Sequence, residues 1–170
     1  MADRAVAQLE DEPLRQPLDS NTNSIAVIMK HVAGNLRSRW TDLLTTDGEK
    51  PWRDRDQEFV DTFGNRDELL DHWNNGWNRL FDTLQSLSDD DLRGSVMIRG
   101  EQHTVPQAIS RSLAHSVYHV GQVVLIARVL AKDKWRTLTI PPRQSAAHNE
   151  ASWGTTQYMG RVDESTEENP

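Results

Sequence analysis

The most constraining feature of the chain is its longest apolar segment, which extends from residue 105 to about 131. Its apolar residues recur at helical spacing, and Pro106 lies where the first turn of a helix tolerates a proline. His115, His119 and Gln122 interrupt the apolar pattern on one face, because residues three or four apart lie one helical turn apart. Buried polar groups cost free energy unless they have partners. The sequence therefore predicts a long core helix whose polar stripe has a specific role.

Two imidazoles at this spacing can bind one metal ion from a single helix face. No glutamate follows His115, so the HExxH motif of metalloproteases is absent. Two neutral imidazoles rarely hold a catalytic divalent metal ion alone, and a third ligand is needed. His31 is the first candidate because it begins a second polar stripe with Asn35, and His72 is the next. Taken alone, however, this spacing is more often a solvated or hydrogen-bonded histidine pair.

The rest of the chain predicts an all-α fold. Residues 25–44 and 65–84 have the apolar periodicity of amphipathic helices, with Phe81 on the inner face of the second. A short helix is predicted at 3–10, and weak alternation predicts a small hairpin just before the last long helix. A four-helix bundle with at least one crossover connection fits this order of elements best.

The connecting segments carry fewer signals. The mixed-charge loop 48–59 is typical of a solvated surface, and no glutamate lies on the histidine stripes, so no general base is evident. The segment after Lys132 is expected to be extended. We expect a helical domain at residues 1–149 and a polar, acidic tail at 150–170 that is disordered.

Composition limits the function. A chain of 170 residues is one domain by size. The formal net charge of −7 argues against nucleic acid or an anionic membrane as the main partner. No apolar run approaches the length of a membrane span, and no signal peptide is recognisable, so we expect a cytoplasmic protein. The chain has no cysteine, which excludes thiolate ligands and cysteine nucleophiles.

Four segments together resemble the DinB-like (YfiT-like) metalloenzymes, and among them an uncharacterised subfamily. They are NSIAVIMKHVAGNLRSRWTDLLTTDGEKPWRDRDQEF, ELLDHWNNGWNRLFDTL, IRGEQHTVPQAISRSLAHSVYHVGQVVLIARVL and WRTLTIPPRQSAAHN, which cover about residues 20–149 in the order of that superfamily. The resemblance implies an up-down-down-up four-helix bundle. It also implies a divalent metal ion held by His31, His115 and His119. Asn35 and Gln122, on the two facing stripes, are the candidates to orient a ligand or bind substrate.

The resemblance further implies a metal-dependent thiol S-transferase that joins a low-molecular-weight thiol to a small electrophile. Zn or Ni is the first expectation for the metal, with Fe, Co or Mn as alternatives. The alternative functions are a metal-dependent hydrolase, a non-catalytic bundle that binds metal or a small ligand, and a purely structural bundle. No other catalytic residue is predicted, and a homodimer is expected because relatives are often dimers.

The chain departs from the superfamily at its first helix. That helix normally runs the length of the bundle, whereas only residues 3–10 precede the first loop here. We expect either a sequence truncated at its start or a partner that covers the apolar surface left exposed.

Overall fold

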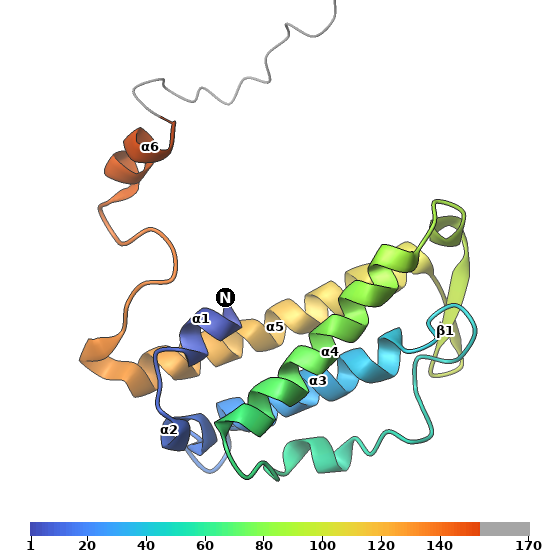
Figure 1. The fold of residues 1–170 in the computed structure, drawn as a ribbon, viewed down its shortest axis with the longest axis horizontal. Helices are drawn as coiled ribbons and strands as arrows, with labels where there is room; N and C mark the ends of the chain where they lie inside the picture. Colours follow the sequence, from blue (N-terminus) through green and yellow to red (C-terminus); the bar gives the residue numbers. More distant parts are fainter. Residues whose placement is uncertain (154–170) are drawn as a thin grey trace, which may run out of the picture. The chain divides into compact units, whose positions relative to one another are not determined.

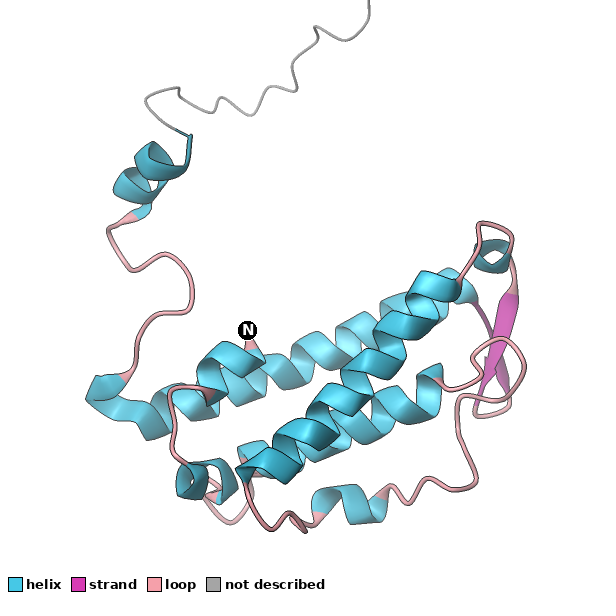
Figure 2. Cartoon of the chain, in the orientation of Figure 1, coloured by secondary structure: helices cyan, strands magenta, loops and turns pink. Residues whose placement is uncertain are grey.

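A computed structural model describes residues 1–153 of the chain (Figures 1 and 2). The described residues are mostly helical, with six α-helices and one two-stranded hairpin, which agrees with the predicted all-α class. Two compact units are present, one of residues 1–135 and a second that begins at residue 136. In the second unit, α6 (Ser145–Trp153) replaces part of the extended segment expected after Lys132, and it spans the predicted domain boundary at residue 149. The predicted acidic tail lies outside the described residues from residue 154 onward.

Three long helices run side by side in the first unit (Figure 1): α3 (Ile25–Trp40), α4 (Arg66–Ser86) and α5 (Val105–Ala131). α3 packs against both of the others and most of its residues are buried. All three helices begin at residues whose side chains accept a hydrogen bond from the first turn, namely Ser24, Asn65 and Thr104. The three predicted helices are therefore confirmed, although α3 ends four residues before the predicted end.

α3 and α4 approach each other most closely where both carry small residues. A Cβ atom at Gly76 of α4 would lie 2.7 Å from the Cα atom of Ala33 in α3, so only glycine fits there. The position of Phe81 was predicted wrongly, because half of this residue is exposed. Its ring stacks on the ring of Trp77, with 5.7 Å between centroids, instead of entering the core.

The N-terminal residues form two short helices, α1 (Ala2–Val6) and α2 (Asp11–Arg15), in place of the single predicted helix. α1 packs against α5 and is linked to the start of α4. The Arg66 guanidinium donates hydrogen bonds to the backbone carbonyls of Val6 and Leu9, at 2.9 and 2.7 Å. These bonds hold the end of α1 in place although the helix itself has only five residues.

The predicted hairpin is confirmed as β1 (Ser95–Ile98) paired with β2 (Glu101–Thr104). Its two turn residues, Arg99 and Gly100, both have positive φ angles of 56° and 74°, as a tight turn between twisted strands requires. The Asp47 carboxylate accepts hydrogen bonds from both turn amides, at 2.8 and 2.7 Å. The loop that follows α3 is thereby fastened to the hairpin that precedes α5.

α5 carries apolar side chains on a face that the first unit leaves exposed. They are Leu113, Val117, Tyr118, Leu125 and Val129, each 48–64% exposed. The stretch Val105–Lys134 is long and apolar enough to cross a membrane by length and composition alone, so the expectation that no segment reaches this length was too strict. A core helix of a water-soluble protein can also meet this criterion, but only 22% of the most apolar window of this stretch is buried, so the prediction of a core helix holds for one face of α5 alone.

Candidate metal centre

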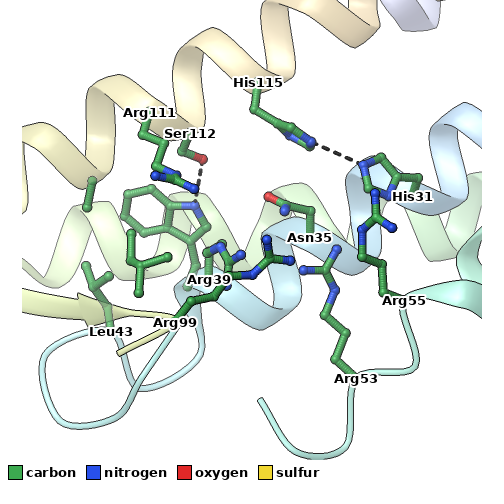
Figure 3. Close-up of a pocket in the computed structure, with 13 residues that line it drawn as sticks. His31, Asn35, Arg39, Leu43, Arg53, Arg55, Arg99, Arg111, Ser112 and His115 are labelled. Atoms are coloured by element: carbon green, nitrogen blue, oxygen red, sulfur yellow. Dashed lines mark hydrogen bonds between the residues drawn. The ribbon is translucent and has the colours of Figure 1, made fainter. Parts of the chain in front are cut away.

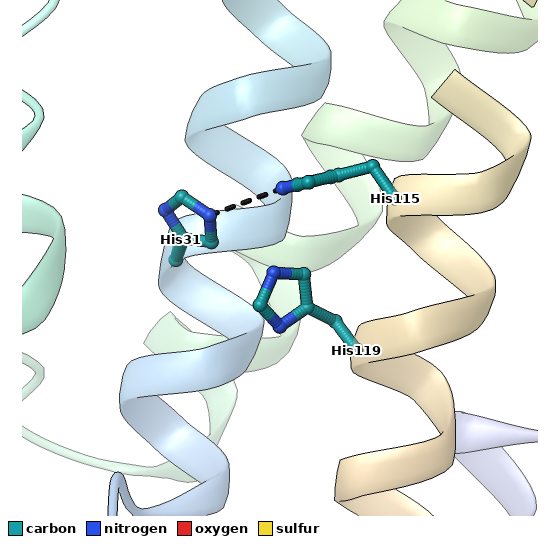
Figure 4. Close-up of side chains that lie close together, drawn as sticks. All are labelled: His31, His115 and His119. Carbon is teal, nitrogen blue, oxygen red and sulfur yellow. Dashed lines mark hydrogen bonds between the residues drawn. The ribbon is translucent and has the colours of Figure 1, made fainter. Parts of the chain in front are cut away.

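His31 of α3 meets His115 and His119 of α5 between the two helices (Figure 4). Each histidine offers one ring nitrogen, and these three atoms all lie within 4.8 Å of one another. The Nε2 atoms of His31 and His115 are 3.2 Å apart. His31 is only 5% exposed, whereas the other two are partly buried. The three predicted ligands are thus brought together by helix packing.

Two of the three imidazoles are oriented by hydrogen bonds at the opposite ring nitrogen. His31 Nδ1 lies 2.8 Å from a carboxylate oxygen of Glu58, and His119 Nδ1 lies 2.9 Å from the amide oxygen of Gln122. An acceptor at Nδ1 requires the proton there and leaves the Nε2 lone pair free. The third ring, His115, has a buried Nδ1 without a hydrogen-bond partner among the described residues.

Glu58 lies in η1 (Asp56–Phe59), within the mixed-charge loop that the sequence assigned to solvated surface. That prediction was wrong for three charged residues of the loop: Glu58 is 6% exposed, Lys50 is 7% exposed and the Arg53 side chain is 2% exposed. Arg53 donates to both oxygens of Glu58, each at 2.8 Å, so a buried ion pair supports His31. Gly34 leaves room for this carboxylate, because a Cβ atom there would lie 2.8 Å from Glu58 Cδ.

The loop is held in this position by the polar stripe of α3. Ser38 and Arg39 both donate to the carbonyl of Gly48, at 2.7 and 2.6 Å, and Arg39 also pairs with Glu49 at 3.1 Å. The stripe that begins at His31 therefore continues as the anchor of the loop that carries Glu58.

The electrostatics of the centre favour the neutral form of the two imidazoles on α5, His115 and His119. Burial lowers the pKa of His115 to about 4, and the nearby His119, His31 and Arg53 add to this effect. Burial also lowers the pKa of His119, against the hydrogen bond to Gln122. For Glu58, burial opposes ionisation, but the hydrogen bonds from His31 and Arg53 outweigh it and lower the pKa of this carboxyl. The centre thus combines two neutral imidazoles on α5 with the ionised carboxylate of Glu58.

These residues fit a divalent metal ion by their chemistry. Neutral imidazole is the form that binds metal, and metal-binding histidines commonly donate their other N–H to a carboxylate or carbonyl oxygen. Glu58 and Gln122 are acceptors of this kind. Three nitrogen ligands leave positions open for water or substrate.

The other histidines lie outside this group. His72, the next candidate by sequence, lies on α4 against the ring of Phe63, with a buried Nε2 that has no hydrogen-bond partner among residues 1–153. His103 is on β2, with Nδ1 lying 3.1 Å from the Glu101 carbonyl oxygen. His148 is an exposed residue of α6.

A cavity of about 190 Å³ opens beside two of the three histidines, His31 and His115 (Figure 3). His31 and His115 line it together with Asn35, which the sequence proposed as a substrate contact. Arg111 also lines the cavity from α5, one turn before His115. The opening makes the histidine centre accessible to a small molecule.

Comparison with known proteins gives a family but no activity. The sequence model of a family described as "Protein of unknown function (DUF1572)" matches residues 1–144. The chain belongs to this family. No curated protein and no solved structure matches the chain. The match to DUF1572 includes all three histidines as well as Glu58 and Gln122.

Sequence reasoning missed two parts of this DUF1572 site. Arg111 precedes His115 by four residues, so the spacing that paired the histidines could also have found it. Glu58 and Arg53 had no such signal, because a loop has no periodicity that indicates which side chains are buried. A glycine within a helix, Gly34, was the one local hint that another chain segment approaches closely.

Proposed function

We propose that this DUF1572 protein binds a divalent metal ion through His31, His115 and His119 and uses it as a thiol S-transferase. The observation that supports this proposal best is the hydrogen bond from His31 Nδ1 to the buried Glu58 carboxylate. The other ring nitrogen of His31 faces His115 and His119. Metal-binding histidines commonly have this arrangement, in which one ring nitrogen faces the metal and the other donates to a carboxylate. Zn or Ni suits three imidazoles best, with Fe, Co or Mn as alternatives.

The chain's own residues would bind and position the reactants. A metal ion bound here would supply the positive charge that favours ionisation of a low-molecular-weight thiol near neutral pH. Asn35 lines the cavity, and its side-chain amide makes no hydrogen bond within residues 1–153, so this amide is available to substrate. Gln122 fixes the ring of His119. The apolar wall formed by Trp40 and Leu43 would limit the access of water to a small electrophile.

A metal-dependent hydrolase is the alternative enzyme, and a specific observation makes it the weaker one. Hydrolysis benefits from a general base close to the attacking water. Glu58 is the carboxylate nearest to the centre by its contacts, and both of its oxygens already accept hydrogen bonds from Arg53, with Oε2 also bonded to His31. A non-catalytic metal-binding or small-ligand-binding bundle is the remaining alternative.

We also infer the finer fold and the setting of the protein. The order of α3, α4, hairpin and α5 suits a DinB-like, up-down-down-up bundle whose first helix is shortened to α1 and α2. The exposed apolar face of α5 is a suitable surface for a second copy of the chain, and we propose a homodimer. We also propose a cytoplasmic location, with neither nucleic acid nor a membrane as a partner, because the acidic composition supports it.

The test is elemental analysis of protein purified without a histidine tag, followed by a thiol-panel assay. We expect near-stoichiometric metal in the wild type and its loss in His119→Ala, with no loss in the control His148→Ala, which changes an exposed histidine. Thiol-dependent consumption of monochlorobimane should accompany the metal. If the wild type contains metal but does not consume monochlorobimane, the non-catalytic alternative is favoured. If the wild type contains no metal, the proposed metal centre is refuted.

A further inference from the structure

The cavity beside His31 and His115 has an unusual charge for this chain. Its lining includes five arginines, Arg39, Arg53, Arg55, Arg99 and Arg111, and no aspartate or glutamate. The chain as a whole carries a formal net charge of −7. A cleft lined by one sign of charge concentrates ligands of the opposite sign. The lining of this cavity is therefore positive in an otherwise acidic protein, and it favours the binding of an anionic ligand.

Nearby carboxylates neutralise only part of this charge. Glu49 contacts three of the arginines, with Arg99 at 2.8 Å, Arg39 at 3.1 Å and Arg53 at 3.6 Å. Glu58 pairs with Arg53 alone among the arginines. Asp47 is a third carboxylate nearby, because it accepts a hydrogen bond from the Arg99 backbone amide at 2.8 Å. Three carboxylates thus lie near five guanidinium groups, and a net positive charge remains at the cavity.

Arg53 supplies a second, independent observation that points to an anionic ligand. Its side chain is 2% exposed, yet its buried Nη1 makes no hydrogen bond among the described residues and lies 3.6 Å from Glu49 Oε1, which is an ion-pair distance too long for a hydrogen bond. Leaving a buried donor of a charged group unsatisfied is costly. In Figure 3 the guanidinium groups of Arg53, Arg39 and Arg99 gather at the same space below Asn35. An anionic oxygen in this space would satisfy Nη1.

Arg55 and Arg111 provide further charge without a carboxylate partner. Arg55 lies over the ring of Phe59, 5.0 Å from its centroid, and Arg111 has its Nη1 3.4 Å from Nε2 of His103. Neither of them forms an ion pair within residues 1–153. Both are exposed, so they can turn toward a ligand without unpacking the core.

The remaining wall of the cavity is apolar. Trp40, Leu43, Ile98 and Ala108 line it, with Leu43 at the end away from His31 (Figure 3). The indole of Trp40 donates to Ser112 Oγ at 3.0 Å and is thereby fixed in place. A ligand that fills this cavity would combine an anionic group with an apolar part.

We propose that this cavity binds a small organic anion by its carboxylate or phosphate group, held at Arg53, Arg55 and Arg111 beside the histidine centre. The role of this anion as a reactant rests on the proposed function, whereas its binding does not require the metal. The anionic group would lie among the guanidinium groups and its apolar part against Trp40 and Leu43.

The test measures binding to metal-free protein by isothermal titration calorimetry at fixed ionic strength. The probes are malonate and inorganic phosphate, with malonamide as the neutral match of malonate. We expect malonate or phosphate to bind and malonamide not to bind. Arg55→Gln and Arg111→Gln should each weaken anion binding by about tenfold, as expected for loss of a charge-assisted hydrogen bond. Arg128→Gln removes the same charge from an exposed position of α5 outside the cavity and should bind like wild type.

The outcomes separate this proposal from the metal-dependent one. Anion binding that is weakened by about tenfold in each of the two cavity variants supports the proposal even if elemental analysis finds no metal. Equal binding of malonamide, or equal loss in Arg128→Gln, would overturn it even if the metal is present. A preference between malonate and phosphate tells which anionic group the natural ligand carries.

Discussion

Gly34→Ala offers a test of the metal centre that changes no ligand and no charge. Gly34 lies in α3, three residues after His31, and its position faces the Glu58 side chain. A Cβ atom there would lie 2.8 Å from Glu58 Cδ and 3.2 Å from Cγ. Ordinary contact needs about 3.4 Å, so the carboxylate must move by about 0.6 Å or more.

The size of the effect follows from the bonds that hold Glu58. Its oxygens are bonded to His31 Nδ1 and to two nitrogens of Arg53, each at 2.8 Å. A displacement of about 0.6 Å takes a bond of this length outside the normal range. Loss of one charge-assisted hydrogen bond costs about 1.5–3 kcal/mol, which corresponds to metal affinity weakened by about 10–100-fold.

The matched control is Gly121→Ala in α5, where an added Cβ atom meets nothing within 4 Å. Alanine is the better helix former by about 0.5–1 kcal/mol, so this variant should unfold at higher urea concentration and keep its metal affinity. In Gly34→Ala the same helical gain is offset by the displaced carboxylate.

The assay is competitive metal binding against a chelator of known affinity, with urea unfolding of both metal-free variants. The reasoning would be refuted if Gly34→Ala bound metal as tightly as Gly121→Ala and gained the same stability. That result would mean that Glu58 does not support the ligand His31.

Three further predictions concern pH, helix packing and assembly. Because the pKa of His115 is lowered to about 4 from an ordinary value near 6.5, the unfolded chain binds more protons between these pH values, and metal-free protein should lose up to about 3 kcal/mol of stability as pH falls through this window. Urea unfolding of metal-free wild type and His115→Gln should show this, and parallel pH profiles would contradict it. Gly76→Ala should destabilise the protein by about 1–3 kcal/mol in urea unfolding, because its Cβ atom would lie 2.7 Å from the backbone of Ala33. If this variant were instead stabilised as much as Gly121→Ala, the close contact between α3 and α4 would be disproved. Leu125→Glu should convert a dimer into a monomer in analytical ultracentrifugation, and a monomeric wild type would reject the homodimer.

Much of the fold was predictable because it depends on local periodicity. The apolar spacing of residues 105–131 gave α5 with both of its ends, and Thr104, Pro106 and Gln107 explain its start by a capping box. The N-terminal helices were predicted less well, since α1 and α2 depend on contacts such as Arg66 to the carbonyl of Val6. A five-residue helix has too few internal bonds for its sequence to specify it.

By itself, the sequence determined that the chain is helical and that His115 and His119 share one helix face. These properties follow from a repeat of 3.6 residues, which is written into the order of the side chains. Only the tertiary structure decided that His31 meets this pair, that Glu58 and Arg53 are buried behind it, and that five arginines line one cavity. Such contacts join segments far apart in the chain through helix packing and loop closure, and no local pattern encodes them.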